Sequence, residues 1–187
     1  MKNIKAIETS YKGFRFRSRL EARWAVFFDS LGIQWEYEKD GYVIDGICYM
    51  PDFYLPRFET FFEVKPGIIT DDAAHKAYML ARAKEFTVII SNDPFSSAIS
   101  DDFISPLNRW FYVRSSALTA VRQLGDVYFG ECPVCHRINI TGIYYGDLYP
   151  IGTGACECDV LNLYMPDNVV NAYLRARRAR FEFGEKG

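Results

Sequence analysis

The chain has 187 residues, of which 49% are hydrophobic and 25% are charged. This length and composition predict one globular domain that has a hydrophobic core and carries a small appendage. They exclude a disordered or low-complexity protein. The formal net charge of −2 does not by itself indicate a nucleic-acid partner, so the distribution of charge matters more than its sum. No segment approaches the ~20 apolar residues of a membrane span. We expect a cytoplasmic protein with no membrane partner.

Three kinds of apolar pattern predict the secondary structure along the chain. Apolar side chains recur every three or four residues in an amphipathic helix, alternate in a half-buried strand and run unbroken in a strand buried on both faces. In chain order, these patterns predict a helix at 18–31, a strand at 33–38, a hairpin at 42–50 that turns at Asp45-Gly46, strands at 52–55 and 61–65, a helix at 70–84, strands at 86–91 and 110–113, and helices at 116–124 and 167–180. Thr70 is expected to cap the second helix, and Asp167, after Pro166, the last.

The order of these elements predicts an α/β fold with a mixed β-sheet flanked by helices. From Tyr128 to Cys158, short aromatic strands, glycines and cysteines predict a module inserted before the last helix. We therefore divide the chain into a core at 1–126, a module at 127–162, and a C-terminal helix and tail at 163–187.

Two carboxylates and a lysine are expected to converge on the hairpin at 52–65. If its turn spans residues 56–59, Asp52 faces Glu63, and Lys65 shares the face of the strand that carries Glu63. Like charges directly opposite each other destabilise an antiparallel pair, and a cation such as Mg²⁺ between them removes that cost. Such a site has the parts needed for phosphodiester hydrolysis. The alternative, an exposed hairpin with surface charges, is disfavoured by its phenylalanines.

The same residues resemble the motif of a known family. Pro51-Asp52, ten intervening residues and Glu63-Val64-Lys65 resemble the signature of the PD-(D/E)XK nuclease superfamily. The preceding run that ends at Glu21 resembles the helix that carries an additional acidic ligand in many members. The similarity covers roughly the first 95 residues and extends to the endonuclease subunit of heteromeric bacterial transposases and to phage-encoded relatives.

The resemblance implies a restriction-endonuclease-like fold and a divalent-metal-dependent endonuclease that cleaves DNA with Mg²⁺ or Mn²⁺. It implies that Asp52 and Glu63 bind the metal, with the Val64 carbonyl as a further ligand. Lys65 would act at the attacking water, and Glu21 would complete or support the metal shell. The implied partners are DNA and a protein subunit or second copy of the chain, in a bacterial or phage-infected cell. The alternative is a non-cleaving nucleic-acid-binding or adaptor protein on a nuclease-derived fold.

Glu21 also has a structural explanation. Ser18-x-x-Glu21 before an apolar helix is a capping-box pattern, in which Glu21 bonds back to the Ser18 amide. Glu21 lies on the same helical row as Trp24 and Phe28, however, and that side is expected to face the sheet. Both roles remain open from the sequence, although the second is favoured.

Basic residues gather in the first 23 residues and again near the C-terminus. Either cluster alone is explained by a solvated helix face, but two clusters that flank a carboxylate site would fit binding of a phosphate backbone. Many relatives also place a Gln, Lys or Tyr on the helix after the motif, where Lys76 and Tyr78 lie. The candidate nucleic-acid-binding residues are Lys12, Arg15, Arg17, Arg19, Lys76, Arg175 and Arg178.

Five cysteines, an odd number with short paired spacings, indicate metal binding in a reducing compartment and not a disulfide framework. Four of them are expected to hold a structural Zn²⁺ in a module that resembles a zinc ribbon. Small buried hydrophobes are the alternative for these four, and His136 is an alternative ligand. Cys48 is expected to be a buried strand residue. The candidate zinc ligands are Cys132, Cys135, Cys156 and Cys158.

Overall fold

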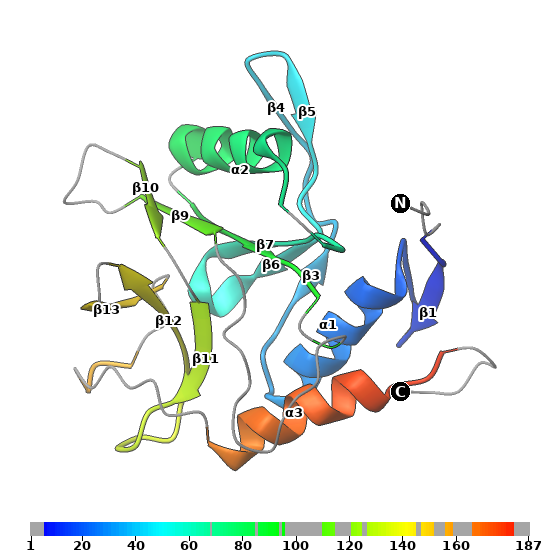
Figure 1. Ribbon diagram of the computed structural model, residues 1–187, viewed down its shortest axis with the longest axis vertical. Helices are drawn as coiled ribbons and strands as arrows, with labels where there is room; N and C mark the ends of the chain where they lie inside the picture. The colour runs from blue at the N-terminus through cyan, green and yellow to red at the C-terminus, as the bar shows by residue number, and fades with distance from the viewer. Residues whose placement is uncertain are drawn as a thin grey trace.

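The computed structural model describes a mixed α/β fold with three α-helices around a mixed sheet (Figure 1). The helices are α1 (Arg19–Ser30), α2 (Asp71–Lys84) and α3 (Asp167–Arg178). None of the described helices has both the length and the apolar character needed to cross a bilayer. The described residues are 6–67, 69–84, 86–93, 95, 110–114, 121–124, 127–144, 147–151, 156–158 and 166–181.

A six-stranded sheet forms the centre, in the order β10-β9-β8-β7-β6-β3. Strands β7 and β8 are parallel neighbours, and the other neighbouring pairs are antiparallel. Every residue of β7 and β8 is buried, as the unbroken apolar pattern of the latter predicts. The six strands are β3 (Glu36–Tyr37), β6 (Phe53–Leu55), β7 (Thr60–Val64), β8 (Thr87–Ser91), β9 (Trp110–Arg114) and β10 (Val121–Leu124).

The two faces of this sheet are covered by different elements. One face packs against α2 and against the hairpin of β4 (Tyr42–Ile44) and β5 (Ile47–Tyr49), which projects beyond α2 (Figure 1). The other face packs against α1. Because successive strand residues point to opposite faces, Phe62 joins the α1 side and Phe61 the α2 side.

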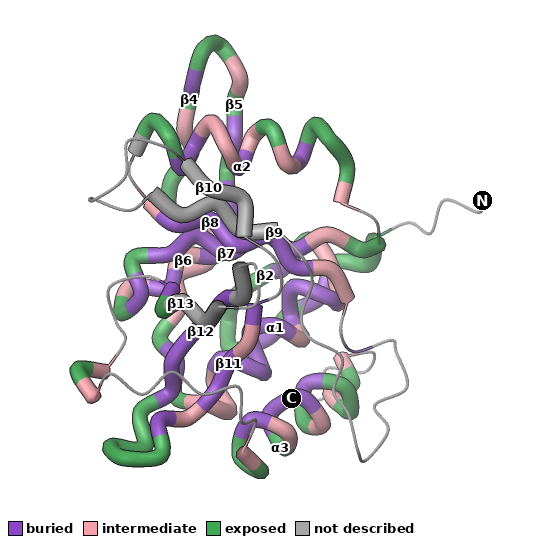
Figure 2. The backbone as a smooth tube through the Cα atoms, turned by 60° about the vertical axis from the view of Figure 1, so that its left-hand side comes forward, coloured by how far each residue is buried: buried purple, intermediate pink, exposed green. Residues whose placement is uncertain are grey.

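A second, three-stranded sheet packs beside α1 and α3. It consists of β11 (Val127–Glu131), β12 (Ile138–Tyr144) and β13 (Asp147–Pro150). Phe129 of β11 lies 5.1 Å from Phe27 of α1, between ring centroids. The strands expected in the inserted module therefore contribute to the same hydrophobic core as α1 and α3, and Figure 2 colours residues of β11, α1 and α3 as buried.

Near the N-terminus, β1 (Thr9–Tyr11) and β2 (Phe14–Phe16) form a short hairpin that leads into α1. Ser18 is the N-cap of α1, as the sequence predicts. The predicted turn at Asp45-Gly46 is also present, and both residues have positive φ, as a type I′ hairpin turn requires.

Four sequence-based predictions differ from the structure: one helix, the length of one strand, one helix cap and the burial of one cysteine. Residues 121–124 form strand β10 instead of the end of a helix, because they pair with β9, while 115–120 lie outside the described residues. The strand predicted at 33–38 is reduced to Glu36–Tyr37, the two residues that pair with β6, and it ends before Glu38, which has a φ of 45°. Pro166, which offers no side-chain acceptor, caps α3, and Asp167 is its first residue. Cys48 is exposed, not buried.

Candidate active site and metal centre

The hairpin of β6 and β7 places two carboxylates opposite each other. Its turn is a 3₁₀ turn at Pro56–Phe58, and Leu55 pairs with Thr60, so the predicted register is confirmed. Continuation of this register puts Asp52 across from Glu63, and the Asp52 amide donates to Glu63 Oε2 at 3.3 Å. The Val64 amide donates to Asp52 Oδ2 at 2.7 Å.

These carboxylates are almost fully removed from solvent. The exposed fraction is 3% for Asp52, 4% for Glu63 and 7% for Glu21. Burial, together with the negative charges of Glu63 and Glu21, raises the pKa of Asp52 to about 7. Acidic side chains are rarely buried this deeply unless a cation compensates them. The arrangement is thus a concentration of negative charge that the fold maintains at a cost.

Two basic side chains partly compensate this charge from the rim. Arg17 Nη2 lies 2.6 Å from Asp52 Oδ1, and its Nε lies 2.8 Å from Glu38 Oε1. Lys65 forms an ion pair with Glu63 Oε1. The Lys65 amide extends the β7–β8 pairing by donating to Ser91 O at 2.7 Å, which keeps Lys65 in register beyond the end of β7.

Glu21 is tied to the start of α1 and to the neighbouring strand. Its amide donates to Ser18 Oγ at 3.2 Å, and Ser18 Oγ donates to Glu21 Oε1 at 2.7 Å. Its other oxygen, Oε2, accepts from the amide of Arg17 at 3.0 Å instead of from the Ser18 amide of a standard capping box. The Tyr37 hydroxyl donates to the same oxygen at 2.6 Å. Glu21 therefore contributes to the helix cap while its charge acts on Asp52.

Two tyrosines adjoin this carboxylate cluster (Glu21, Asp52 and Glu63). Burial raises the pKa of Tyr37, and its hydrogen bond to Glu21 raises it further. Burial also raises the pKa of Tyr49, from β5, and the neighbouring charges of Glu63 and Asp52 add to this effect. The hairpin β4–β5 thus covers the carboxylates with a tyrosine that stays protonated at neutral pH.

The sequence did not place Arg17, Tyr37 or Tyr49 in this cluster. Arg17 was expected only to contact nucleic acid, and its partner Asp52 is 35 positions away in the chain. No local pattern signals such a contact, because it depends on how β2 and α1 pack against the sheet.

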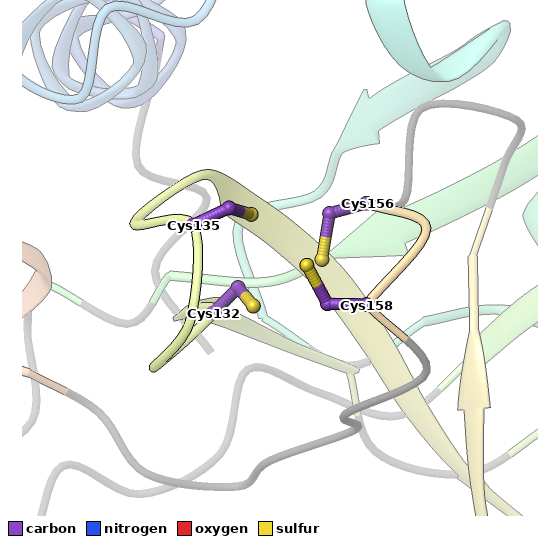
Figure 3. Close-up of side chains that lie close together, drawn as sticks. All are labelled: Cys132, Cys135, Cys156 and Cys158. Atoms are coloured by element: carbon purple, nitrogen blue, oxygen red, sulfur yellow. The ribbon is translucent and has the colours of Figure 1, made fainter.

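The cysteines form a second cluster, which Figure 3 shows with all four side chains directed toward a common centre. Their sulfur atoms all lie within 4.8 Å of one another, so they could hold a metal such as zinc. Among the described residues, this is the one group of three or more His, Cys, Asp or Glu side chains that meets this distance. Cys132 and Cys135 lie in the turn between β11 and β12, and Cys156 and Cys158 follow β13.

The turn that carries Cys132 has the hydrogen bonds of a metal-binding knuckle. The Cys132 amide donates to Arg137 O at 2.9 Å, and the His136 amide donates to Cys132 O at 2.9 Å. The Val134 amide lies 3.4 Å from Cys132 Sγ, where it stabilises a thiolate. His136 lies outside the cluster, because its ring nitrogen Nδ1 pairs with Glu131 at 2.7 Å.

Asn139 of β12 supports the other half of the cysteine cluster. Its side-chain nitrogen lies 3.4 Å from Cys156 Sγ, and its oxygen accepts from the Cys156 amide at 3.1 Å. The hydrogen bonds from Asn139 and from the Cys158 amide lower the pKa of the Cys156 thiol to about 6. A hydrogen bond with Cys135 raises the pKa of Cys158 to about 12. These hydrogen bonds favour a thiolate at Cys156, and a thiolate is the form that binds metal.

The basic residues expected to contact nucleic acid have different environments. Lys12 pairs with Asp29 at 2.9 Å, Arg15 with Glu8, and Lys76 with Asp72 at 2.7 Å. Exposed pairs of this kind contribute only about 0–1 kcal/mol, so they break readily. Arg175 and Arg178 occupy the last turn of α3, and Arg19 the first turn of α1. Tyr78, whose role the sequence leaves open, packs against the α2 side of the core.

Comparison of the chain with protein-family models, with characterised proteins and with solved structures finds no match.

Proposed function

We propose that the chain is a divalent-metal-dependent endonuclease of the restriction-endonuclease-like type that hydrolyses phosphodiester bonds in DNA. The observation that carries this proposal is the buried pair of Asp52 and Glu63 on adjacent antiparallel strands, with Lys65 on the same face. A mixed sheet flanked by helices agrees with the fold that the motif implies. Buried like charges of this kind are stabilised by a hard cation, and oxygen ligands suit Mg²⁺ and Mn²⁺.

In this proposal Asp52, Glu63 and the Val64 carbonyl hold the metal, and Glu21 supports the shell. The carboxylates are not yet gathered as tightly as the cysteines, because Arg17 and Lys65 occupy an oxygen of each. Metal binding would release both basic side chains. When bound, the metal supplies positive charge that polarises a phosphate oxygen and makes water more acidic.

The basic side chains then act on the substrate. Lys65, freed from Glu63, orients the attacking water or stabilises the developing negative charge. Arg17, freed from Asp52 and more than half exposed, is in position to neutralise the phosphate. The same side chains would thus balance the charge of the carboxylates before metal binds and that of the substrate afterwards.

The test is incubation of the protein with supercoiled, linear, branched and single-stranded DNA, with and without Mg²⁺ or Mn²⁺. Cleavage is expected only with metal, and Asp52→Asn and Lys65→Gln should each lower the rate at least ~100-fold, the magnitude typical of losing one such group. Glu21→Gln should lower it as well if Glu21 serves the metal shell and not only the helix cap.

Glu59→Gln is the matched control, because Glu59 is an exposed acid in the turn of the same hairpin. Its cleavage rate should equal that of the wild type. If no DNA is cut, or if Asp52→Asn cuts as fast as the wild type, the proposed active site is wrong.

A non-cleaving nucleic-acid-binding protein is the second candidate function. The ion pairs of Arg17 with Asp52 and of Lys65 with Glu63 favour it, since they satisfy the carboxylates without metal. It predicts DNA binding that is unaffected by Mg²⁺, and no cleavage.

We also propose that the cysteine cluster holds a structural Zn²⁺. All four ligand positions are filled by thiols, which leaves no open position for chemistry.

A further inference from the structure

A hollow of about 700 Å³ lies where the start of α1 meets the end of α3. Five arginines line it, together with Ala179 and Phe181, and no described acidic residue does. We call it the arginine hollow. The five are Arg19 and Arg23 of α1 and Arg177, Arg178 and Arg180 at the end of α3.

The packing of the two helices explains why these arginines meet. The rings of Phe27 on α1 and Tyr173 on α3 lie 4.3 Å apart between centroids. Arg23 and Arg19 lie about one and two turns before Phe27, respectively, on the same row of α1. Because the helices run in opposite directions, the end of α3 lies beside the start of α1 (Figure 1). Two clusters far apart in the sequence therefore become one.

Four of the five arginines lack the ion pairs that other basic residues of the described chain form. Within the described part of the chain, Arg23, Arg177, Arg178 and Arg180 form no ion pair, unlike Lys12. The Nε atom of Arg23 is buried and has no hydrogen-bond partner among the described residues. An unsatisfied buried donor is costly, and it calls for an acceptor.

Helix dipoles explain only part of this arrangement. Arginines in the last turn of α3 are favourable there, because the C-terminal end of a helix carries partial negative charge. The helix dipole does not favour Arg19 and Arg23, because both lie near the positive end of α1. Like charges that face one another across a hollow are stabilised when an anion lies between them.

We infer that the arginine hollow binds a backbone phosphate of the DNA strand. This inference rests on the proposed function, since DNA is the polyanion it supplies. Arg19 is two residues from Glu21 in the helix, which is about 200° around its axis, so the hollow lies on the other side of α1 from the carboxylate cluster. The hollow would therefore bind the DNA strand at a phosphate distant from the bond that is cut. Planar guanidinium groups suit this task because each donates two hydrogen bonds to a phosphate.

The test measures the binding of a short fluorescein-labelled DNA duplex by anisotropy, at several salt concentrations. Asp52→Asn serves as the background throughout, so that cleavage does not interfere. Arg178→Gln should weaken binding several-fold and lower the slope of log K against log salt by about 1, and Arg177→Gln/Arg178→Gln should lower it by about 2. Arg82→Gln is the matched control: Arg82 is an exposed arginine on α2 that lies outside the hollow, and the slope of this variant should not change.

Thermal unfolding should show that each variant folds as its parent does. The inference is overturned if the hollow variants bind DNA as tightly as the background, or if Arg82→Gln weakens binding equally, which would indicate a diffuse charge effect. Inorganic phosphate is titrated as a competitor in a separate arm. If it binds in an Arg178-dependent way while DNA binding does not depend on Arg178, the hollow takes a free phosphate and the assignment to a strand is wrong.

This experiment is independent of cleavage. Loss of DNA binding in the hollow variants of a protein that cuts nothing would support the hollow and contradict the nuclease. If the wild type cleaves DNA and the hollow variants bind DNA as tightly as their parent does, the nuclease is supported and the hollow is contradicted.

Discussion

At the scale of single residues, the Asp52 carboxylate is the group whose protonation most affects the stability of the fold. It is 3% exposed, it faces Glu63, and its pKa is raised to about 7 by burial and by its acidic neighbours. In the unfolded chain an aspartate titrates near pH ~4. The folded protein therefore retains a proton on Asp52 across a pH range in which the unfolded chain has lost it.

This difference predicts how the stability of the metal-free protein depends on pH. Because the folded pKa lies above the unfolded one, the contribution of Asp52 is fully present below pH ~4 and is lost as pH rises to about 7. Asp52→Asn removes the titrating group, so it should stabilise the metal-free protein at pH ~8 by up to about 4 kcal/mol relative to the wild type, and not at pH ~4. Urea unfolding with zinc retained and no added Mg²⁺ measures the free energy of unfolding of the wild type and of Asp52→Asn at each pH.

Glu59→Gln controls for this experiment, since it removes an exposed carboxylate from the same hairpin. Its effect on the free energy of unfolding should be small and nearly independent of pH. Equal stability of wild type and Asp52→Asn across the whole range would show that Asp52 has no raised pKa.

The sequence anticipated the residues that depend on local geometry and missed those that depend on packing. The opposition of Asp52 and Glu63 follows from one short turn, which is why register alone predicts it. Arg17 reaches Asp52 only because α1 packs against the sheet, and Asn139 reaches Cys156 only because β12 passes beneath the cysteines. No spacing in the sequence encodes either contact.

At the scale of elements, the same distinction separates the correct predictions from the wrong ones. Helix α1 and the hairpin at Asp45-Gly46 are specified by their own caps and turn residues. Strand β10 gains its hydrogen bonds from β9, a partner that a helical pattern in the sequence cannot reveal. The restriction-endonuclease-like assignment stays a prediction, whereas the mixed sheet itself is present.

The cysteine knuckle supports a prediction about the element that joins β11 to β12. Elemental analysis should find one zinc per chain, and Cys132→Ser should abolish it. Asn139→Ala should weaken zinc binding by roughly 10–100-fold, as expected for a residue that orients a ligand, because Cys156 loses its hydrogen-bond partner. Competition with a chromogenic chelator measures the affinity.

Cys48→Ser is the control for the zinc experiment, because Cys48 is an exposed cysteine on β5 outside the cluster. It should retain full zinc content. Zinc that persists in Cys132→Ser, or that disappears in Cys48→Ser, would show that the metal is held elsewhere.

At the scale of the whole molecule, the shared core couples the three-stranded sheet to α1 and α3. Phe129 of β11 is 1% exposed and contacts the rings of both Phe27 and Trp24. The boundary expected near residue 126 thus does not coincide with a gap in the packing.

This coupling predicts a single cooperative unfolding transition. Phe129→Ala should lower the free energy of unfolding by about 3–5 kcal/mol, as for a fully buried phenylalanine, and should shift circular dichroism and tryptophan fluorescence together. Val134→Ala, at an exposed position of the knuckle, should leave the transition nearly unchanged. Two separate transitions in the Phe129 variant would show that the sheet folds as an independent unit.

The contact between α1 and α3 also has a consequence for synthesis of the chain on the ribosome. Phe27 is made early, but the side chain that covers it, Tyr173, belongs to the last described helix. At about 5–20 residues per second, the apolar side of α1 stays uncovered for many seconds while the intervening chain is made. The nascent chain therefore exposes aromatic surface of the kind that chaperones bind, and the contact of Phe27 with Tyr173 cannot form until α3 has been made.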